Sequence, residues 1–201
     1  MVKCMQLFSR DKIILDLCGG SGRWSKPYAD AGYNVRVITW PDDVRLFKKS
    51  KDRIYGILAA PPCTHFAGVG SRWWLEKDKD GRTLDGISVM DAGLRIIHVE
   101  KPIFWCIENP SGRMSSFLGP PDMTFHPWEF GDPYTKLTCL WGKFKPPQKK
   151  PVKPICAKPN ENCIDKYIQD VRGLSLTGKN RAELRSITPP GFAKAFFEAN
   201  K

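Results

Sequence analysis

The chain has 201 residues, of which 41% are hydrophobic and seven are tryptophan. This length and apolar content predict one folded domain with a sizeable core and exclude a disordered chain. No apolar run exceeds about six residues, which is too short to cross a bilayer or to serve as a secretory signal. Seven cysteines at irregular spacings favour reduced thiols over a disulfide framework, so we expect a cytoplasmic protein.

Positive charge is concentrated in one part of the chain. The net charge is +11 with an isoelectric point near 9.4, and residues 136–181 hold eleven Lys and Arg against three Asp and Glu, a net charge of +8. A polyanion such as a nucleic acid is the natural partner of such a surface, and its binding would depend strongly on salt. A solubilising face rich in lysine is the alternative interpretation.

Buried strands alternate with helices along the first half of the chain. Strands are predicted over residues 13–18, 34–39, 54–60 and 103–107, and helices over residues 24–32 and 84–99. Residues 46–53 are polar and undecided, whereas the glycines, charges and two tryptophans of residues 67–86 indicate a long mobile loop. The alternation predicts an α/β fold, with a mostly parallel sheet and helices on both faces.

The second half of the chain has fewer signals. A strand is predicted over residues 137–141 and a terminal helix over residues 191–200. Residues 145–159 contain five prolines and five lysines, which indicate a linker or a binding loop rather than a packed element. The three cysteines of this half and His126 lack the Cys-x-x-Cys spacing of a zinc knuckle, so no metal site is predicted.

A glycine-rich turn follows the first predicted strand. Asp16 and Cys18 lie in the last part of this strand, and Gly19, Gly20 and Gly22 follow it before the first predicted helix. In open α/β sheets a ligand lies at the carboxyl ends of the strands, where glycines let the backbone approach it closely. The position of the turn therefore predicts a cofactor site, although many structural turns have similar sequences.

The second predicted strand ends in an aromatic and acidic segment. Asp42 and Asp43 are candidates to bind a ribose or an adenine amino group, and Trp40 is a candidate to stack on an adenine ring. A capped turn with a tryptophan in the core explains the same residues equally well.

Pro61, Pro62 and Cys63 follow the third predicted strand. Two prolines restrict the backbone and present the next side chain rigidly, and a polar segment follows. This pattern favours a nucleophilic thiol, although a buried structural cysteine is the usual role of such a residue.

Glu108 and Asn109 follow the fourth predicted strand. Burying a carboxylate without a purpose is costly, and transfer of a proton to a ring nitrogen needs an acid with a raised pKa. The alternative is that backbone amides, or an arginine such as Arg113, neutralise this carboxylate.

These segments together resemble the cytosine-5 DNA methyltransferase family, and more closely its short versions from phages and prophages. The glycine-rich turn is similar to the family's cofactor motif, Pro61-Pro62-Cys63 to its nucleophile motif and Glu108-Asn109 to its Glu-Asn pair. Residues 186–193 are similar to the last motif, which returns to complete the cofactor pocket. The four motifs stand in the family's order and span most of the chain.

The resemblance implies a class I S-adenosylmethionine-dependent methyltransferase fold, which is Rossmann-like. It also implies a DNA (cytosine-5)-methyltransferase that uses S-adenosylmethionine, with Cys63 attacking carbon 6 of a flipped cytosine and Glu108 supporting ring nitrogen 3. The implied cofactor-binding residues are Asp16, Cys18, Gly19, Gly20, Gly22, Trp40, Asp42, Asp43 and Pro61. The implied substrate-binding residues are Pro62, Asn109, Arg72, Lys136 and Thr138.

The sequence departs from the family in four places. Residues 40–43 compress a helix and an acidic motif, and the last motif lacks the family's Gly-Asn start. The other two departures concern the substrate. Lys136 and Thr138 stand where arginines that hold the flipped cytosine are expected. The target-recognition region is reduced to residues 143–180, so residues 1–142 and 181–201 are predicted to form the catalytic domain of a monomer. These departures keep two alternatives open: a catalytically silent methyltransferase-fold protein that binds DNA, and a methyltransferase acting on RNA or cytosine nucleotides.

Overall fold

A computed structural model describes residues 11–156, 163–178 and 180–201. Six strands form one sheet in the order β2-β1-β3-β4-β6-β5. The strands are β1 (Ile13–Leu17), β2 (Asn34–Ile38), β3 (Ile54–Ala59), β4 (Phe104–Pro110), β5 (Met123–Phe125) and β6 (Thr138–Lys143). The first four are parallel to one another, whereas β6 runs antiparallel to both of its neighbours.

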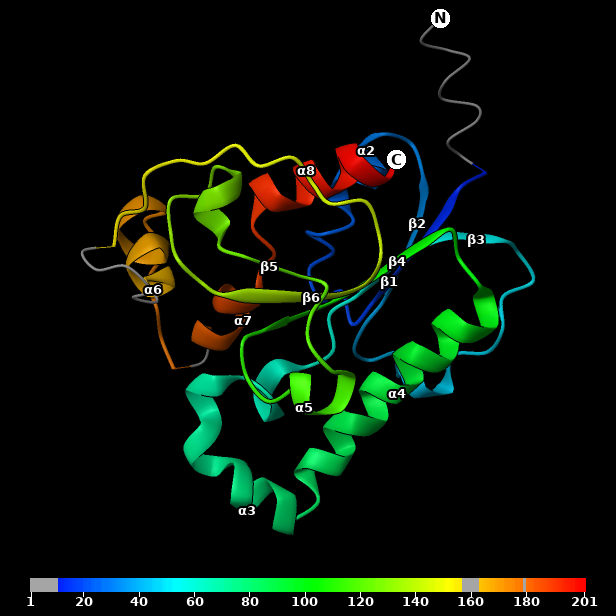
Figure 1. The fold of residues 1–201 in the computed structure, drawn as a ribbon, viewed down its shortest axis with the longest axis horizontal. Helices are drawn as coiled ribbons and strands as arrows, with labels where there is room; N and C mark the ends of the chain where they lie inside the picture. Colours follow the sequence, from blue (N-terminus) through cyan, green and yellow to red (C-terminus); the bar gives the residue numbers. More distant parts are fainter. Residues whose placement is uncertain (1–10, 157–162, 179) are drawn as a thin grey trace, which may run out of the picture.

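Helices cover both faces of this sheet (Figure 1). The α-helices are α2 (Lys26–Asp30), α3 (Trp74–Lys79), α4 (Arg82–Glu100), α5 (Ser115–Leu118), α6 (Ile164–Lys166), α7 (Arg181–Ser186) and α8 (Pro190–Asn200). Shorter 3₁₀ turns occupy Val44–Leu46, Cys63–His65, Gly68–Trp73 and Pro127–Phe130, and a π turn occupies Tyr167–Val171. None of the helices in the described ranges is long and apolar enough to cross a membrane.

The alternation of side chains along β1 divides the core into two layers. Leu15 faces α4 and joins a cluster that includes Ile57 and Ile96, whereas Ile14 faces α2 and α8 and joins a cluster that includes Phe192. Because successive residues of a strand point to opposite faces, a strand that is covered on both faces is buried along its whole length. All five residues of β1 are accordingly buried. The predicted α/β, Rossmann-like architecture with a mostly parallel sheet is confirmed.

The order of the strands also locates a ligand site. The chain passes from β1 to β2 on one side and then returns to place β3 on the other side of β1. Ligands of open α/β sheets bind at such a switch point, beyond the carboxyl ends of the strands. The amide of Ala60 donates to the carbonyl of Leu17 at 2.9 Å, so the segments that follow β1 and β3 leave the sheet side by side.

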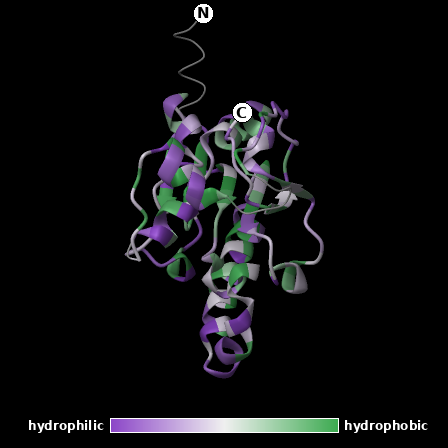
Figure 2. Cartoon of the chain, turned by 90° about the vertical axis from the view of Figure 1, so that its left-hand side faces the viewer, coloured by the Kyte–Doolittle hydropathy of each residue, from purple (hydrophilic) through white to green (hydrophobic). Residues whose placement is uncertain are grey.

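The prediction of a long mobile loop over residues 67–86 is wrong, because most of this segment is helical. Residues 64–86, which we call the helical arm, contain two 3₁₀ turns, α3 and the start of α4, and Figure 2 shows α3 and this end of α4 projecting from the body. The arm is held by contacts distant in sequence. The guanidinium of Arg113 donates to the carbonyl of His65 at 2.9 Å and to the carboxylate of Asp78 at 2.8 Å, and the buried Lys77 ammonium donates to the carbonyl of Thr64 at 2.6 Å.

Other boundaries differ in ways that matter for the site. Strand β4 continues through Glu108 to Pro110, because these residues pair with β6; they lie within the strand rather than after it. The first predicted helix is helical only from Lys26, since tight turns occupy the residues before it. The expectation of reduced thiols is wrong for Cys156 and Cys163, which form a disulfide.

Candidate active site

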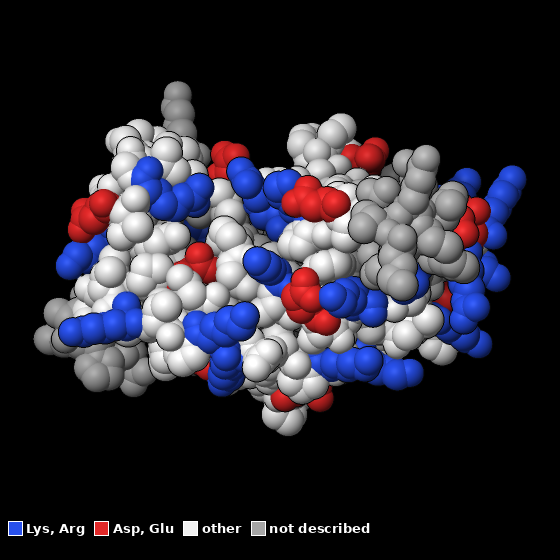
Figure 3. Space-filling view, turned by 90° about the horizontal axis from the view of Figure 1, so that it is seen from above, with Lys and Arg blue, Asp and Glu red and all other residues white. Residues whose placement is uncertain are grey.

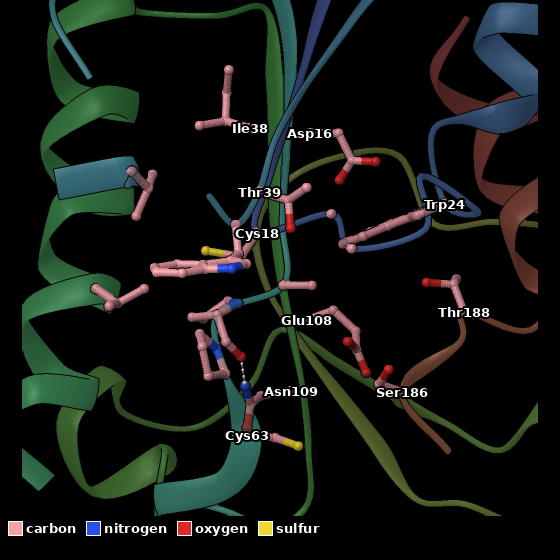
Figure 4. A pocket seen from close by; sticks show the side chains of 18 of the residues that line it. Asp16, Cys18, Trp24, Ile38, Thr39, Cys63, Glu108, Asn109, Ser186 and Thr188 are labelled. Carbon is pink, nitrogen blue, oxygen red and sulfur yellow. Dashed lines mark hydrogen bonds between the residues drawn. The ribbon is translucent and has the colours of Figure 1, made fainter. Parts of the chain in front are cut away.

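A pocket of about 380 Å³ opens at the carboxyl ends of β1, β3 and β4. Figure 4 shows side chains from β1 and β4, from the segment that follows β3 and from the segment before α8, facing this space. The lining residues are Asp16, Cys18, Gly19, Gly20, Ser21, Trp24, Ile38, Thr39, Trp40, Asp42, Asp43, Val44, Arg45, Ala60, Pro61, Pro62, Cys63, Val89, Glu108, Asn109, Pro110, Lys136, Ser186 and Thr188.

The glycine-rich turn has the conformation that its sequence predicts. Gly20 and Gly22 have φ angles of 52° and 65°, in the left-handed region that favours glycine. The amide of Gly22 donates to the carbonyl of Gly19 at 2.8 Å and closes the turn. Gly22 itself lies outside the pocket lining, so its place in this structure is in the turn and not on the pocket wall.

Asp16 is a fully buried carboxylate on the wall of the pocket. The hydroxyl of Ser25 donates to its Oδ2 at 2.5 Å, while Oδ1 has no hydrogen-bond partner among the described residues. Burial raises the pKa of Asp16 to about 6, and the hydrogen bond from Ser25 opposes this shift. A buried oxygen that faces a pocket without a partner is a site for a ligand donor.

The segment after β2 forms the rim of the pocket. The indole of Trp40 is 88% exposed, so the alternative of a tryptophan in the core is wrong. The other half of that alternative, a capped turn, is present, because Asp43 accepts from the backbone amide of Arg45 at 2.9 Å. The guanidinium of Arg45 also pairs with Asp43 at 2.7 Å and with Asp85 of α4 at 2.6 Å. Asp42 forms no ion pair within the described ranges, which leaves its carboxylate free for a ligand.

Cys63 begins the 3₁₀ turn that follows Pro61 and Pro62. Its side chain is half-buried and lines the pocket, in contrast to the core thiols of Cys106 and Cys139. Burial and the nearby Glu108 raise the pKa of the Cys63 thiol, whereas the positive charge of Lys136 lowers it. The thiol is thus accessible from the pocket, and burial together with the two neighbouring charges shifts its pKa.

Glu108 reaches the same part of the pocket from β4. Its carboxylate forms no hydrogen bond or ion pair to any described residue, and Arg113, the suggested partner, instead binds Asp78 and the arm. The alternative of a carboxylate neutralised by Arg113 is therefore wrong. Burial raises the pKa of Glu108, and Lys136 opposes the shift. Figure 4 shows the side chains of Glu108 and Ser186 pointing toward each other.

Two hydrogen bonds hold this end of the pocket together. The side-chain amide of Asn109 donates to the carbonyl of Pro61 at 2.8 Å (Figure 4), which ties the end of β4 to the segment that carries Cys63. The ammonium of Lys136 donates to the carbonyl of Arg185 at 3.0 Å, which holds this cation at the pocket.

Two of the predicted substrate-binding residues lie away from the pocket lining. Thr138 is buried in β6, and its hydroxyl donates to the carbonyl of Lys136 at 3.1 Å. Arg72 lies on the arm, with its guanidinium 5.2 Å from the ring of Trp73. The other predicted site residues, except Gly22, line the pocket.

Sequence reasoning missed several lining residues. Thr39 directly follows β2, and Trp24 belongs to the turn before α2. Ser186 and Thr188 come from the segment before α8; the resemblance of residues 186–193 to a motif that returns to the cofactor pocket was the available signal for these two.

Comparisons with known proteins add little to this geometry. No protein-family model matches the chain, and a search of curated proteins found no relative. Among solved structures, the chain is similar to a crystal structure from E. coli described as a "putative DNA modification methyltransferase encoded within prophage". The identity is 18%, the TM-score is 0.47, and the match covers 71% of this chain and 53% of that one, so the chain spans about half the length of this neighbour.

Proposed function

We propose that this protein is a DNA (cytosine-5)-methyltransferase that uses S-adenosylmethionine and forms a covalent adduct through Cys63. The observation that supports the proposal best is the meeting of a thiol, a carboxyl group and a cation, from Cys63, Glu108 and Lys136, on one pocket. The glycine-rich turn after β1 lines the same pocket. A nucleophile and an acid at one end and a cofactor turn at the other are what transfer of a group to a pyrimidine requires.

The residues at the turn fit the chemical groups of S-adenosylmethionine. The unpartnered Oδ1 of Asp16 is suited to accept a hydrogen bond from a positively charged amino group. Gly19 has no side chain, so a ligand can approach its backbone closely. The exposed Trp40 ring offers a surface for an adenine, and Asp42 offers an acceptor for ribose hydroxyls. When bound, this cofactor supplies a methyl group on a positively charged sulfur, which is a strong electrophile.

Cys63, Glu108 and Lys136 would act on the cytosine ring itself. The Cys63 sulfur forms a bond to carbon 6, and the electron pair of the double bond moves onto the ring toward carbon 5 and nitrogen 3. Burial raises the pKa of Glu108 and so favours its protonated form, in which the carboxyl group donates to nitrogen 3 and stabilises this charge. After carbon 5 has gained the methyl group, its proton is lost to water or a base and the bond to sulfur breaks, which restores the ring.

Burial raises the pKa of the Cys63 thiol, and the local charges modify this shift. Two negative groups close together oppose each other's ionisation, so a protonated Glu108 favours the thiolate of Cys63. The ammonium of Lys136 lowers the pKa of both groups. Lys136 would therefore support the nucleophile even though it replaces an arginine of the family pattern.

The test is a mass-spectrometric measurement of nucleosides. The protein is incubated with unmethylated DNA and S-adenosylmethionine, and the DNA is digested and weighed. We expect 5-methylcytosine from the wild type and from Cys139→Ala, which changes a core thiol outside the pocket, and none from Cys63→Ala. A Cys63→Ala protein that methylates as well as wild type would exclude the covalent mechanism.

Two outcomes would favour the alternatives. Retained cofactor and DNA binding without any modified base, on duplex or single-stranded DNA, would indicate a silent binding protein. Preferential methylation of RNA or of cytosine nucleotides in a competition with DNA would change the substrate class while keeping the chemistry at Cys63.

A further inference from the structure

The segment that connects β6 to the C-terminal part of the chain lies across α8. We call residues 144–153 the lysine strap; Figure 1 shows it passing over the top of the molecule beside α8. It has no regular secondary structure, yet backbone hydrogen bonds fix it along its length. Lys145 exchanges two hydrogen bonds with the side chain of Asn200, at 2.8 and 3.0 Å. The amide of Lys150 donates to the carbonyl of Glu129 at 2.8 Å, and that of Val152 to Trp128 at 2.9 Å.

This fixed backbone presents cations that have no acidic partner. The side chains of Lys145, Lys150 and Lys153, and that of Lys194 on α8, are exposed. No ion pair involves any of these four lysines in the part of the chain that the structure describes. The nearby acids are already paired, Glu129 with Lys149 and Glu198 with Lys201. Figure 3 looks down on this face, where blue cationic side chains outnumber red acidic ones.

A hollow of about 650 Å³ separates the strap from α8, with Lys150 and Lys194 among its lining residues. Four like charges held on a fixed surface repel one another, and a polyanion relieves that repulsion by displacing the counterions around it. We propose that the lysine strap and α8 form a second nucleic-acid contact, which binds the phosphate backbone of DNA outside the catalytic pocket. This inference rests on the proposed function for its choice of DNA as the polyanion.

The dimensions and the path of the strap agree with this role. An extended proline-rich segment advances about 3.1 Å per residue, so the backbone from Lys145 to Lys153 spans roughly 25 Å, the length of about seven base pairs. Beyond the strap, the amide of Ile155 donates to the carbonyl of Pro133 at 2.9 Å. Pro133 precedes Lys136, which lines the pocket, so the chain just beyond the strap is bonded to the segment that carries this pocket cation.

Lysine ammonium groups are flexible point charges that bind phosphates without reading bases. The strap therefore supplies affinity rather than sequence preference. The sequence predicted that residues 143–180 form a reduced recognition region. The strap, which is part of this range, would instead bind DNA of any sequence.

The experiment compares the salt dependence of DNA binding in two variants with equal charge loss. The first changes Lys145, Lys150, Lys153 and Lys194 to glutamine. The control changes Lys48, Lys49, Lys51 and Arg53 to glutamine; these cations are also exposed and unpaired among the described residues, but they belong to the connection between β2 and β3, outside the strap and α8. Binding of a 30-base-pair duplex is measured by fluorescence anisotropy across a salt series, and thermal melts verify that each variant is folded.

We expect the strap variant to bind at least ten-fold more weakly at low salt, for several unrelated duplex sequences alike. Its slope of log affinity against log salt should be smaller by about 3.6, since four cations are lost and each phosphate contact contributes about 0.9 to that slope. The control should keep the slope of the wild type within about one.

Equal slopes in the two variants, or a loss confined to one DNA sequence, would overturn the proposal, and so would a larger effect on RNA than on DNA of the same length. Failure of the proposed function is distinguishable, because the strap effect is measured by binding alone. A protein that methylates nothing but shows the slope difference would retain the strap as a DNA contact.

Discussion

At the scale of single residues, Gly19 and Gly20 are constrained for different reasons. A Cβ atom on Gly19 would lie 2.4 Å from Cγ of Asp16, a distance that real side chains do not reach, although the backbone there is not left-handed. Gly20 has a φ of +52° but open space around it. A side chain at Gly19 would collide with Asp16, whereas a side chain at Gly20 would only strain the backbone. Substitutions at these two residues therefore test the two effects separately.

We expect Gly19→Ala to displace Asp16 or the turn and to weaken S-adenosylmethionine binding at least ten-fold. Gly20→Ala should cost about 1 kcal/mol of the free energy of unfolding through left-handed strain, with a smaller effect on the cofactor. Calorimetric titration and urea denaturation measure both quantities. Unchanged cofactor affinity in Gly19→Ala would contradict the placement of the cofactor at this turn.

Asp16 should make the stability of the free protein depend on pH. Its pKa is about 6 in the folded state against an ordinary 3.8, so the folded protein binds the extra proton between these values and loses stability as the pH rises through them. The loss reaches about 3 kcal/mol above pH 6, at roughly 1.4 kcal/mol per pKa unit. Asp16→Asn removes this cost, and we expect it to be more stable than wild type at pH 8 but not at pH 4.

Ser25→Ala is the matched comparison for this prediction. The Ser25 hydroxyl lowers the pKa of Asp16 by hydrogen bonding to its carboxylate, so its removal should steepen the loss of stability with pH. Denaturation curves at pH 4 and pH 8 measure the three proteins side by side. Parallel pH dependences in wild type and Asp16→Asn would show that Asp16 is not the responsible group.

At the scale of elements, Arg113 organises the helical arm. Its side chain is only 11% exposed and binds the arm at His65, Asp78 and Thr83. We expect Arg113→Met to destabilise the arm by about 2 kcal/mol, because the partly buried hydrogen bonds that a charged group makes to His65 and Thr83 are lost. Faster amide exchange in residues 64–86 and slower methyl transfer should accompany this loss.

Arg82→Met is the control, since Arg82 pairs with Glu76 and Asp80 of the same arm at 46% exposure. An exposed pair contributes less than about 1 kcal/mol, so exchange in the arm should change little. Equal exchange in the two variants would mean that the arm does not depend on its anchor at Arg113.

The strands could be predicted from the sequence, whereas the helical arm could not. The parallel strands were predictable because each is a short apolar run ended by glycine, proline or a polar residue, and most site residues followed because they lie just beyond those strands. The arm was not predictable, because its order depends on Arg113, which is 35 residues from Asp78. Strand β5 has only three residues, which are too few to show an alternating pattern. Nothing in the neighbouring sequence indicates that Arg45 forms an ion pair with Asp43 or that Trp40 is exposed.

At the scale of the whole molecule, the two ends of the chain share one wall of the pocket. Trp24 lines the pocket, and its ring lies 5.5 Å from that of Phe196 and 6.0 Å from that of Phe192 in α8. Ser186 and Thr188 reach the pocket just before the same helix. A ligand that packs against Trp24 therefore stabilises α8 as well, although α8 itself does not line the pocket.

We expect S-adenosylmethionine to slow amide exchange throughout α8, with a global gain of about 2.7 kcal/mol at a concentration of one hundred times its Kd. Phe196→Ala should lose about 3–5 kcal/mol of stability and bind the cofactor more weakly without touching it; Phe196→Leu is the milder variant in case the first does not fold. Phe117→Ala, at a residue 42% exposed on α5, should leave the cofactor affinity unchanged. The Phe196 variants test the contact between α8 and Trp24, so wild-type cofactor affinity in a folded Phe196 variant would show that Trp24 does not couple the pocket wall to α8.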